Sequence, residues 1–167
     1  MPSEVILQRH DEGWRPVVEA EAGRLLAASD ALVAVHHIGS TAIPGIMAKP
    51  VIDLLGIVTD LPRLDWQRRA IEALGYDWRG EYGLAGRRYC TRSDGAGRRF
   101  HLHCYEDGDP AVARHLAFRD YLRACPEVAT AYEQEKLRCA ALHHADGHSY
   151  TDCKSAWIRR VEQEALG

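Results

Sequence analysis

The sequence has no excess of either charge. Its 21 Lys and Arg residues nearly balance 24 Asp and Glu residues, which gives a formal net charge of -3. Proteins that hold a DNA or RNA backbone usually present a basic patch or stripe. We therefore expect no nucleic-acid partner.

Paired cysteines, long apolar runs and a secretory leader are also missing. The cysteines are odd in number and form no CxxC pair: Cys90, Cys104, Cys125, Cys139 and Cys153. The pattern predicts reduced thiols and no cysteine zinc site. No apolar run approaches the ~18 residues of a membrane span, and the N-terminus lacks a basic segment followed by an apolar one. We expect no membrane partner and a cytoplasmic location.

The hydrophobic patterning predicts one α+β domain over residues 1–167. The chain is 46% hydrophobic, enough for a core without metal or disulfide support, and it contains no linker or repeat. Strands with one interleaved helix should come first, to about residue 108, followed by a helical tail over about 109–167. The expected strands are 4–8, 31–38, 50–58, 87–92 and 98–105, and the expected helices are 11–29, 61–74, 110–124, 126–144 and 148–165.

A small-residue turn follows the strand at 31–38. Gly39, Ser40 and Thr41 would expose backbone N–H groups there, and such a turn can hold a phosphate. Glycine lets the backbone approach a ligand, and serine adds a hydroxyl donor. The alternative is a tight turn with a helix cap and no ligand.

One carboxylate, Asp53, lies in the middle of the apolar strand at 50–58. An unpaired buried charge there would cost several kcal/mol, so Asp53 needs a partner. A metal ion, a lysine or a cluster of N–H groups would serve and would suggest function. A structural ion pair with an arginine is the alternative.

The string HIGSTAIPGIMAKPVIDLL, residues 37–55, closely resembles the hallmark of the GrpB family of the nucleotidyltransferase superfamily. Members of that family occur alone and as a domain fused behind dephospho-CoA kinase. The resemblance spans nearly the whole chain and continues through 101–103, 118–123, 132–136 and 150–154.

The resemblance implies a nucleotidyltransferase-like mixed sheet flanked by helices, with a C-terminal helical bundle. It also implies transfer of a nucleoside monophosphate from a nucleoside triphosphate to an acceptor hydroxyl. Gly39 and Ser40 would hold phosphates, and clustered carboxylates would hold Mg2+ or Mn2+. The sequence departs from this plan, because Val51 stands two residues before Asp53 where a second carboxylate is usual.

Histidines stand where the superfamily has a third carboxylate. His101 and His103 are two apart on a strand, so they should share one face while Leu102 points to the other. With Asp53 they would suit Zn2+, Mn2+ or iron better than Mg2+. Either histidine could instead act as a catalytic base, and we predict that His103 and Asp53 are the catalytic residues. The alternative is that both face solvent or bond within the sheet.

Two lysines of the tail each lie four residues after a tyrosine. Lys136 follows Tyr132 and Lys154 follows Tyr150, so each pair shares a helix face. Lys154 falls on an apolar stripe and therefore needs an anion, either a carboxylate such as Asp53 or Asp120 or the phosphates of a ligand. We predict that Lys49, Tyr150 and Lys154 contact phosphate.

Two basic pairs, Arg87 with Arg88 and Arg98 with Arg99, fall on the strands of the expected hairpin. If they face each other they can clamp phosphate through guanidinium donors, with Arg88 as the phosphate ligand. The alternative is that they are solvated edge residues.

Three functions remain open from the sequence. The first is a metal-dependent nucleotidyltransferase acting on a small hydroxyl-bearing acceptor. The second is a degenerate module that binds a nucleotide or a coenzyme A-like phosphate ester. The third, a metal-dependent hydrolase or binder that uses the histidines, has a thin ligand set. The sequence does not specify the acceptor, the nucleotide or the oligomeric state.

Overall fold

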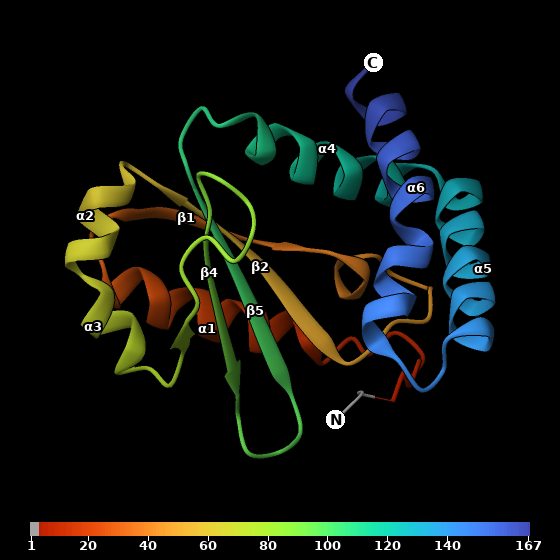
Figure 1. The fold of residues 1–167 in the computed structure, drawn as a ribbon, viewed down its shortest axis with the longest axis horizontal. Coiled ribbons are helices and arrows are strands. Elements are labelled where there is room, and N and C mark those ends of the chain that lie inside the picture. The colour runs from red at the N-terminus through yellow and green to blue at the C-terminus, as the bar shows by residue number, and fades with distance from the viewer. Residues whose placement is uncertain (1–3) are drawn as a thin grey trace.

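A five-stranded mixed sheet forms the centre of the protein (Figure 1). The computed structural model describes residues 4–167. The sheet order is β1-β2-β5-β4-β3, in which β2 and β5 are parallel and the other neighbours antiparallel. The strands are β1 Leu32–Ile38, β2 Val51–Val58, β3 Asp77–Trp78, β4 Arg88–Ser93 and β5 Arg99–Glu106. This confirms the α+β class and the mixed sheet.

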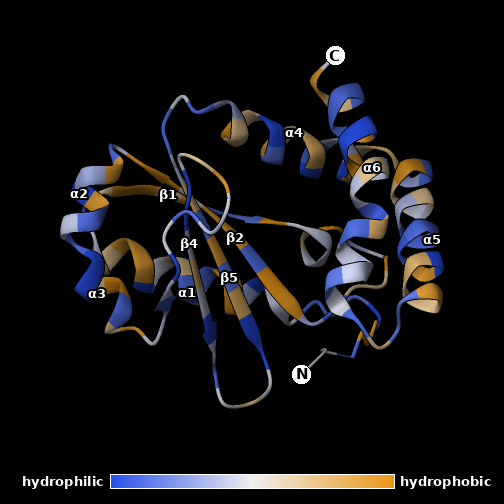
Figure 2. Ribbon diagram, viewed as in Figure 1, coloured by the Kyte–Doolittle hydropathy of each residue, from blue (hydrophilic) through white to orange (hydrophobic). Residues whose placement is uncertain are grey.

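Alternation along the strands gives the sheet two different faces. The core face carries Ile52, Leu54, Phe100 and Leu102, which pack with residues of the helices behind the sheet. Burying each such side chain contributes roughly 1.5–3 kcal/mol. These helices are α1 Trp14–Ala28, α2 Leu61–Trp66 and α3 Arg68–Glu72. The apolar colouring in Figure 2 covers the first half of β1 and much of β2, as expected for strands that form the core.

The opposite face, called here the site face, is covered by apolar packing over only part of its area. At one end Leu55, Ile57 and Tyr105 pack with residues of α4 Pro110–Ala124. At the other end Asp53 and the β5 histidines line a cavity instead. The uncovered end of the site face is therefore where a ligand has room.

Two further helices, α5 Pro126–Leu142 and α6 Gly147–Leu166, complete the tail. Proline occupies the first position of α4 and α5, where its missing N–H is harmless. Phe118, Tyr132 and Val161 of this tail pack with Ile43 and Ile46 of the loop after β1. That packing brings α6 opposite the site face (Figure 1). Within residues 4–167, no helix combines the length and the apolar character needed to cross a membrane.

Three expectations about local structure are wrong. Residues 4–8 form no strand, and only Gln8 pairs, through an isolated bridge to Ala48. The helix expected over 61–74 is split into α2 and α3 at Gln67, whose side chain donates to Asp30 at 2.5 Å and ties the helix to the α1–β1 turn. The short strand β3 was not expected.

The cysteine expectation is wrong for two of the five residues. Cys139 of α5 and Cys153 of α6 form a disulfide with a Cα–Cα distance of 5.8 Å. The short connection between α5 and α6 turns the chain back, so that cysteines 14 residues apart meet across the helix pair. Cys90, Cys104 and Cys125 are free thiols.

Candidate functional site

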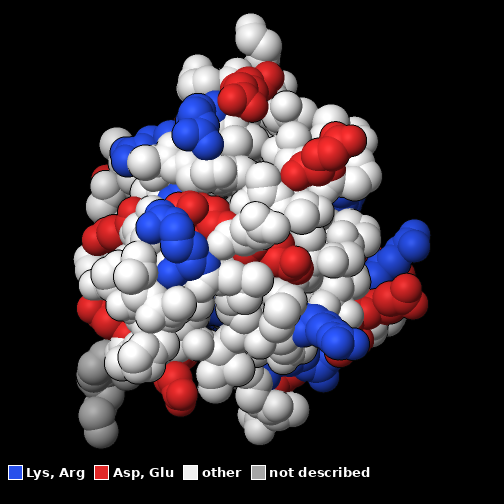
Figure 3. All heavy atoms as spheres, turned by 90° about the vertical axis from the view of Figure 1, so that its right-hand side faces the viewer, with Lys and Arg blue, Asp and Glu red and all other residues white. Residues whose placement is uncertain are grey.

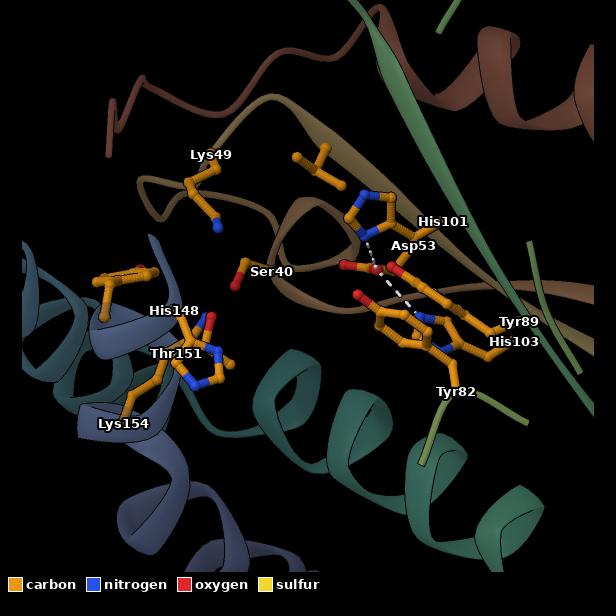
Figure 4. A pocket seen from close by; sticks show the side chains of 12 residues that line it. Ser40, Lys49, Asp53, Tyr82, Tyr89, His101, His103, His148, Thr151 and Lys154 are labelled. Carbon is orange, nitrogen blue, oxygen red and sulfur yellow. Dashed lines mark hydrogen bonds and ion pairs between the residues drawn. The ribbon is translucent and has the colours of Figure 1, made fainter. Parts of the chain in front are cut away.

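A cavity of about 400 Å³ lies between the site face and α6 (Figure 4). Ser40 and Asp53 both line it, together with His101, His103 and Lys154. The turn after β1 and the carboxylate of β2 therefore share one cavity. Asp53 makes no ion pair with an arginine among residues 4–167, which removes the structural alternative considered from the sequence.

The turn after β1 is shaped by the close approach of Asp53. Gly39 has φ +74° and ψ -172°, a conformation that side chains strongly disfavour. A Cβ atom on Gly39 would lie 2.7 Å from Oδ2 of Asp53. Gly39 thus lets the turn and the carboxylate lie in contact, which explains glycine at this position.

Ser40 and Thr41, the next two residues of this turn, point to different sides. The Ser40 hydroxyl faces the cavity and donates to the Tyr132 hydroxyl at 3.0 Å. Thr41 is buried, lies 2.7 Å from Nε2 of His37 and donates to the Val51 carbonyl at 3.2 Å. Thr41 therefore holds the turn against β2 and is not placed to contact a ligand in this cavity.

Two histidines contact the Asp53 carboxylate. Its Oδ1 lies 3.2 Å from Nε2 of His103 and 3.7 Å from Nδ1 of His101. Nη1 of Arg87 lies 3.5 Å from Nδ1 of His103. Because a guanidinium always carries its protons, Nδ1 of His103 accepts and Nε2 donates to Asp53. Leu102 lies in the core, so the prediction that the histidines share one face and Leu102 the other is confirmed.

The electrostatics keep Asp53 charged and His101 neutral. Burial opposes the charge of Asp53, but the hydrogen bond from His103 and the nearby histidines and Lys154 outweigh it, so the pKa of Asp53 falls below its ordinary value. Burial lowers the pKa of His101, with Asp53 opposing that shift. Near neutral pH the site therefore presents an anionic carboxylate beside a neutral imidazole.

The donor set fits a divalent cation of the transition series. One carboxylate and two imidazoles suit Zn2+ or Mn2+ better than Mg2+. Nε2 of His101 is buried without a hydrogen-bond partner, as expected for a nitrogen that a bound group would satisfy. The ligand atoms of the three side chains do not all lie within 4.8 Å of one another, so a shared cation requires the rings to rotate.

Three lysines surround Tyr150 and Tyr132 on the α6 side. Nζ of Lys49 and of Lys154 lie 5.1 and 4.7 Å from the centre of the Tyr150 ring. Lys136 is fully buried and donates to the Met47 carbonyl. Burial and the charge of Lys154 lower the pKa of Lys136 to about 7, and the same two causes lower the pKa of Lys49.

None of these lysines forms an ion pair within 4.0 Å with a carboxylate of residues 4–167. Asp120, one of the anions considered for Lys154, pairs with Arg119 instead. Lys49 and Lys154 line the cavity, so an anion bound there would relieve their mutual repulsion.

The expected arginine clamp does not form. In the antiparallel hairpin Ser93 pairs with Arg99 beside the turn, whereas Arg88 pairs with Cys104 at the far end. Arg88 therefore shares the core face with Cys104 and binds Asp65 of α2 at 2.7 and 2.9 Å. It lies outside the cavity and is not a phosphate ligand of this site.

Other residues of the cavity were missed from the sequence. Tyr89 of β4 pairs with His103, and Arg87 lies over its ring at 4.7 Å. Tyr82 also lines the cavity, as does Thr151. The alternation of β4 could have identified Tyr89, because it shares a face with His103 once the register is known. Tyr82, in a glycine-rich loop, gave no such signal.

The outer face formed by α5 and α6 mixes acidic and basic side chains (Figure 3). Lys49 and Lys154, in contrast, line the cavity.

The fold of the sheet that carries the Ser40 turn and the Asp53 strand is shared with Cid1. The structure of Cid1 in complex with its short product ApU superposes with a TM-score of 0.54 at 13% identity, over 80% of this chain and 42% of that chain. At this identity the likeness shows a shared fold.

The chain belongs to the GrpB family. The family model described as GrpB protein matches residues 4–164. The crystal structure of the conserved protein GrpB from Enterococcus faecalis superposes with a TM-score of 0.88 at 38% identity, over 96% of this chain and 97% of that chain. The UPF0157 protein YqkA of Bacillus subtilis is 42% identical over 163 residues, which cover 97% of this chain and 47% of YqkA. The chain thus spans about half the length of that relative.

Proposed function

We propose that this protein is a metal-dependent nucleotidyltransferase, which moves a nucleoside monophosphate from a nucleoside triphosphate to a small hydroxyl-bearing acceptor. The observation that carries the proposal is that Ser40, Asp53, Lys49 and Lys154 line one cavity. A hydroxyl donor, a carboxylate and two cations without carboxylate partners suit a polyphosphate. The nucleotidyltransferase fold supports the same assignment.

In this reaction the acceptor oxygen bonds to the α-phosphorus, the bond from that phosphorus to the bridging oxygen breaks, and pyrophosphate leaves. Ser40 would donate to a phosphate oxygen once its hydroxyl turns from Tyr132, while Lys49 and Lys154 balance the phosphate charge. The hydroxyl proton passes to the hydrogen-bonded pair of His103 and Asp53, since an imidazole paired with a carboxylate can act as a general base.

Asp53 and His101 would hold the divalent cation, with His103 beside them. Mg2+, Mn2+ or Zn2+ bound there would neutralise charge that develops on the phosphates. His103 also positions Asp53, because it donates to Oδ1 while Arg87 contacts its other nitrogen.

A second candidate is a non-catalytic module that binds a nucleotide or a coenzyme A-like phosphate ester. The observation in its favour is that Asp53 is the sole carboxylate among the described residues lining the cavity. Val51 lines the same cavity, two residues earlier, where a second acid would help hold a cation.

Pyrophosphate release separates the two candidates. The protein is incubated with each nucleoside triphosphate, Mn2+ or Mg2+ and a pool of small hydroxyl compounds. The transferase predicts release that is lost in Asp53→Asn and kept in Asp120→Asn, a control on the exposed side of α4. Nucleotide binding without pyrophosphate release, and unaffected by EDTA, would support the binding module instead.

Elemental analysis of untagged protein tests the cation site directly. Metal that co-purifies or can be loaded should fall in His101→Ala and in Asp53→Asn. Wild-type protein that retains no Zn2+ or Mn2+ under any loading condition would remove the cation from the proposal.

A further inference from the structure

We propose that Tyr82, stacked on Tyr89, forms a nucleobase-binding subsite at one end of the cavity. This inference rests on the proposed function in so far as the ligand is a nucleotide. Tyr82 would recognise the base, whereas Ser40, Lys49 and Lys154 contact the phosphates.

The position of Tyr82 is built into the β3–β4 loop. Its φ of +48° makes it the one non-glycine residue with positive φ within residues 4–167. A bulky side chain disfavours this conformation, so the surrounding contacts must hold it. Arg87, which is buried, donates through Nη2 to the Tyr82 carbonyl at 2.8 Å and through Nε to the Glu81 carbonyl at 3.2 Å.

The ring of Tyr82 belongs to a stack that begins on the sheet, and the guanidinium of Arg79 lies 5.7 Å from the centre of the Tyr82 ring. The guanidinium of Arg87 lies 4.7 Å from the Tyr89 ring centre, and the Tyr89 and Tyr82 rings are stacked with centres 5.2 Å apart and planes inclined by 27°. Tyr82 remains 61% exposed while it lines the cavity. The exposed part of the Tyr82 ring offers a surface to another flat ring, and stacking of this kind accepts any nucleobase.

The cavity as a whole has an aromatic end and a cationic end. Figure 4 shows Tyr82 and Tyr89 on one side and Lys49 and Lys154 on the other, with Ser40 between them. A nucleotide has the same order, with a flat base at one end and charged phosphates at the other. Base on Tyr82 and phosphates near the lysines would place the linking atoms beside the reacting centre.

The test compares ligands with and without a base. Calorimetric titration measures the Kd of ATP, UTP and inorganic tripolyphosphate for the wild-type protein, Tyr82→Ala and Tyr82→Phe. Leu84→Ala is the matched control, because Leu84 is an exposed residue of the same loop that is not part of the cavity lining. Thermal melting verifies that each variant is folded.

The subsite predicts that Tyr82→Ala weakens ATP and UTP binding roughly tenfold, the loss expected when one stacked base is removed. Tripolyphosphate should bind within twofold of wild type, and Tyr82→Phe and Leu84→Ala should leave all three Kd values unchanged. Unchanged ATP affinity in Tyr82→Ala overturns the subsite. An equal loss for tripolyphosphate also overturns it, because the loop rather than the ring would then be responsible.

The wild-type protein distinguishes this inference from the proposed function. Tripolyphosphate bound as tightly as ATP would overturn the base subsite and leave the phosphate site standing. Failure to bind either ligand would overturn both.

Discussion

Replacing Gly39 with alanine should disrupt the site through one identifiable contact. The new Cβ would lie 2.7 Å from Oδ2 and 3.1 Å from Cβ of Asp53, closer than the turn can tolerate without a shift. Either the turn moves away from β2 or Asp53 rotates away from His103. Both outcomes separate the Ser40 turn from the carboxylate.

The size of the effect follows from two contributions. A side chain at φ +74° and ψ -172° costs about 1–3 kcal/mol in backbone strain. Loss of the hydrogen bond between His103 and Asp53 adds about 1 kcal/mol. We therefore expect the free energy of unfolding to fall by about 3 kcal/mol in Gly39→Ala, with loss of nucleotide affinity and of pyrophosphate release.

Gly45→Ala is the matched control for this experiment. Gly45 lies in the loop that follows the Ser40 turn and also has positive φ, +82°, but a Cβ there would meet nothing within 4 Å. The free energy of unfolding of Gly45→Ala should fall only by the backbone strain, about 1–2 kcal/mol, and the variant should keep its affinity for nucleotide. Urea denaturation of both variants measures the difference. In an Asp53→Ala background the Gly39→Ala cost should shrink, because the 2.7 Å contact is gone. Equal losses in the two glycine variants, with ligand binding intact, would refute the reasoning.

Three further predictions concern other parts of the molecule. Between pH 7 and pH 10 the unfolded chain keeps a proton on Lys136 that the folded protein has released. The free energy of unfolding should therefore rise with pH over this range, by up to about 4 kcal/mol. Urea denaturation at several pH values should show that most of this rise is lost in Lys136→Met. Arg87→Ala should weaken ATP binding several-fold in a calorimetric titration, whereas Arg88→Ala, which breaks a half-buried pair with Asp65 outside the cavity, should leave it unchanged. Cys139→Ser should lower the free energy of unfolding by about 3 kcal/mol relative to wild type in oxidising buffer. The difference should be much smaller in dithiothreitol, which reduces the Cys139–Cys153 disulfide of the wild type. Equal differences in both buffers would contradict a contribution from the disulfide.

The strands β1 and β2 could be predicted because they are mostly apolar by composition. The stretch 31–38 was expected as a strand, and β1 runs over Leu32–Ile38. Pro110 and Pro126 correctly marked the starts of α4 and α5. These features are local, because side-chain type and proline geometry determine them without knowledge of the neighbours.

The candidate site was predictable only where it depends on the alternation of side chains between the two faces of a strand. His101 and His103 share a face because they are two apart, and Asp53 meets them because β2 and β5 are parallel neighbours in register. Arg88 was misplaced because the sequence shows a hairpin without showing which residues pair at its far end. Tyr82 depends on Arg87 to hold its loop, and that tertiary contact leaves no periodic signal.

The account depends most on the claim that the Ser40 turn and Asp53 hold one ligand between them. Its most direct test is a crystal structure with a non-hydrolysable nucleoside triphosphate and Mn2+, in which anomalous scattering locates the metal. The account predicts Mn2+ coordinated by Asp53, with phosphates within hydrogen-bond distance of Ser40 and near Lys154. A triphosphate bound elsewhere, with no phosphate or metal at either Ser40 or Asp53, would contradict it.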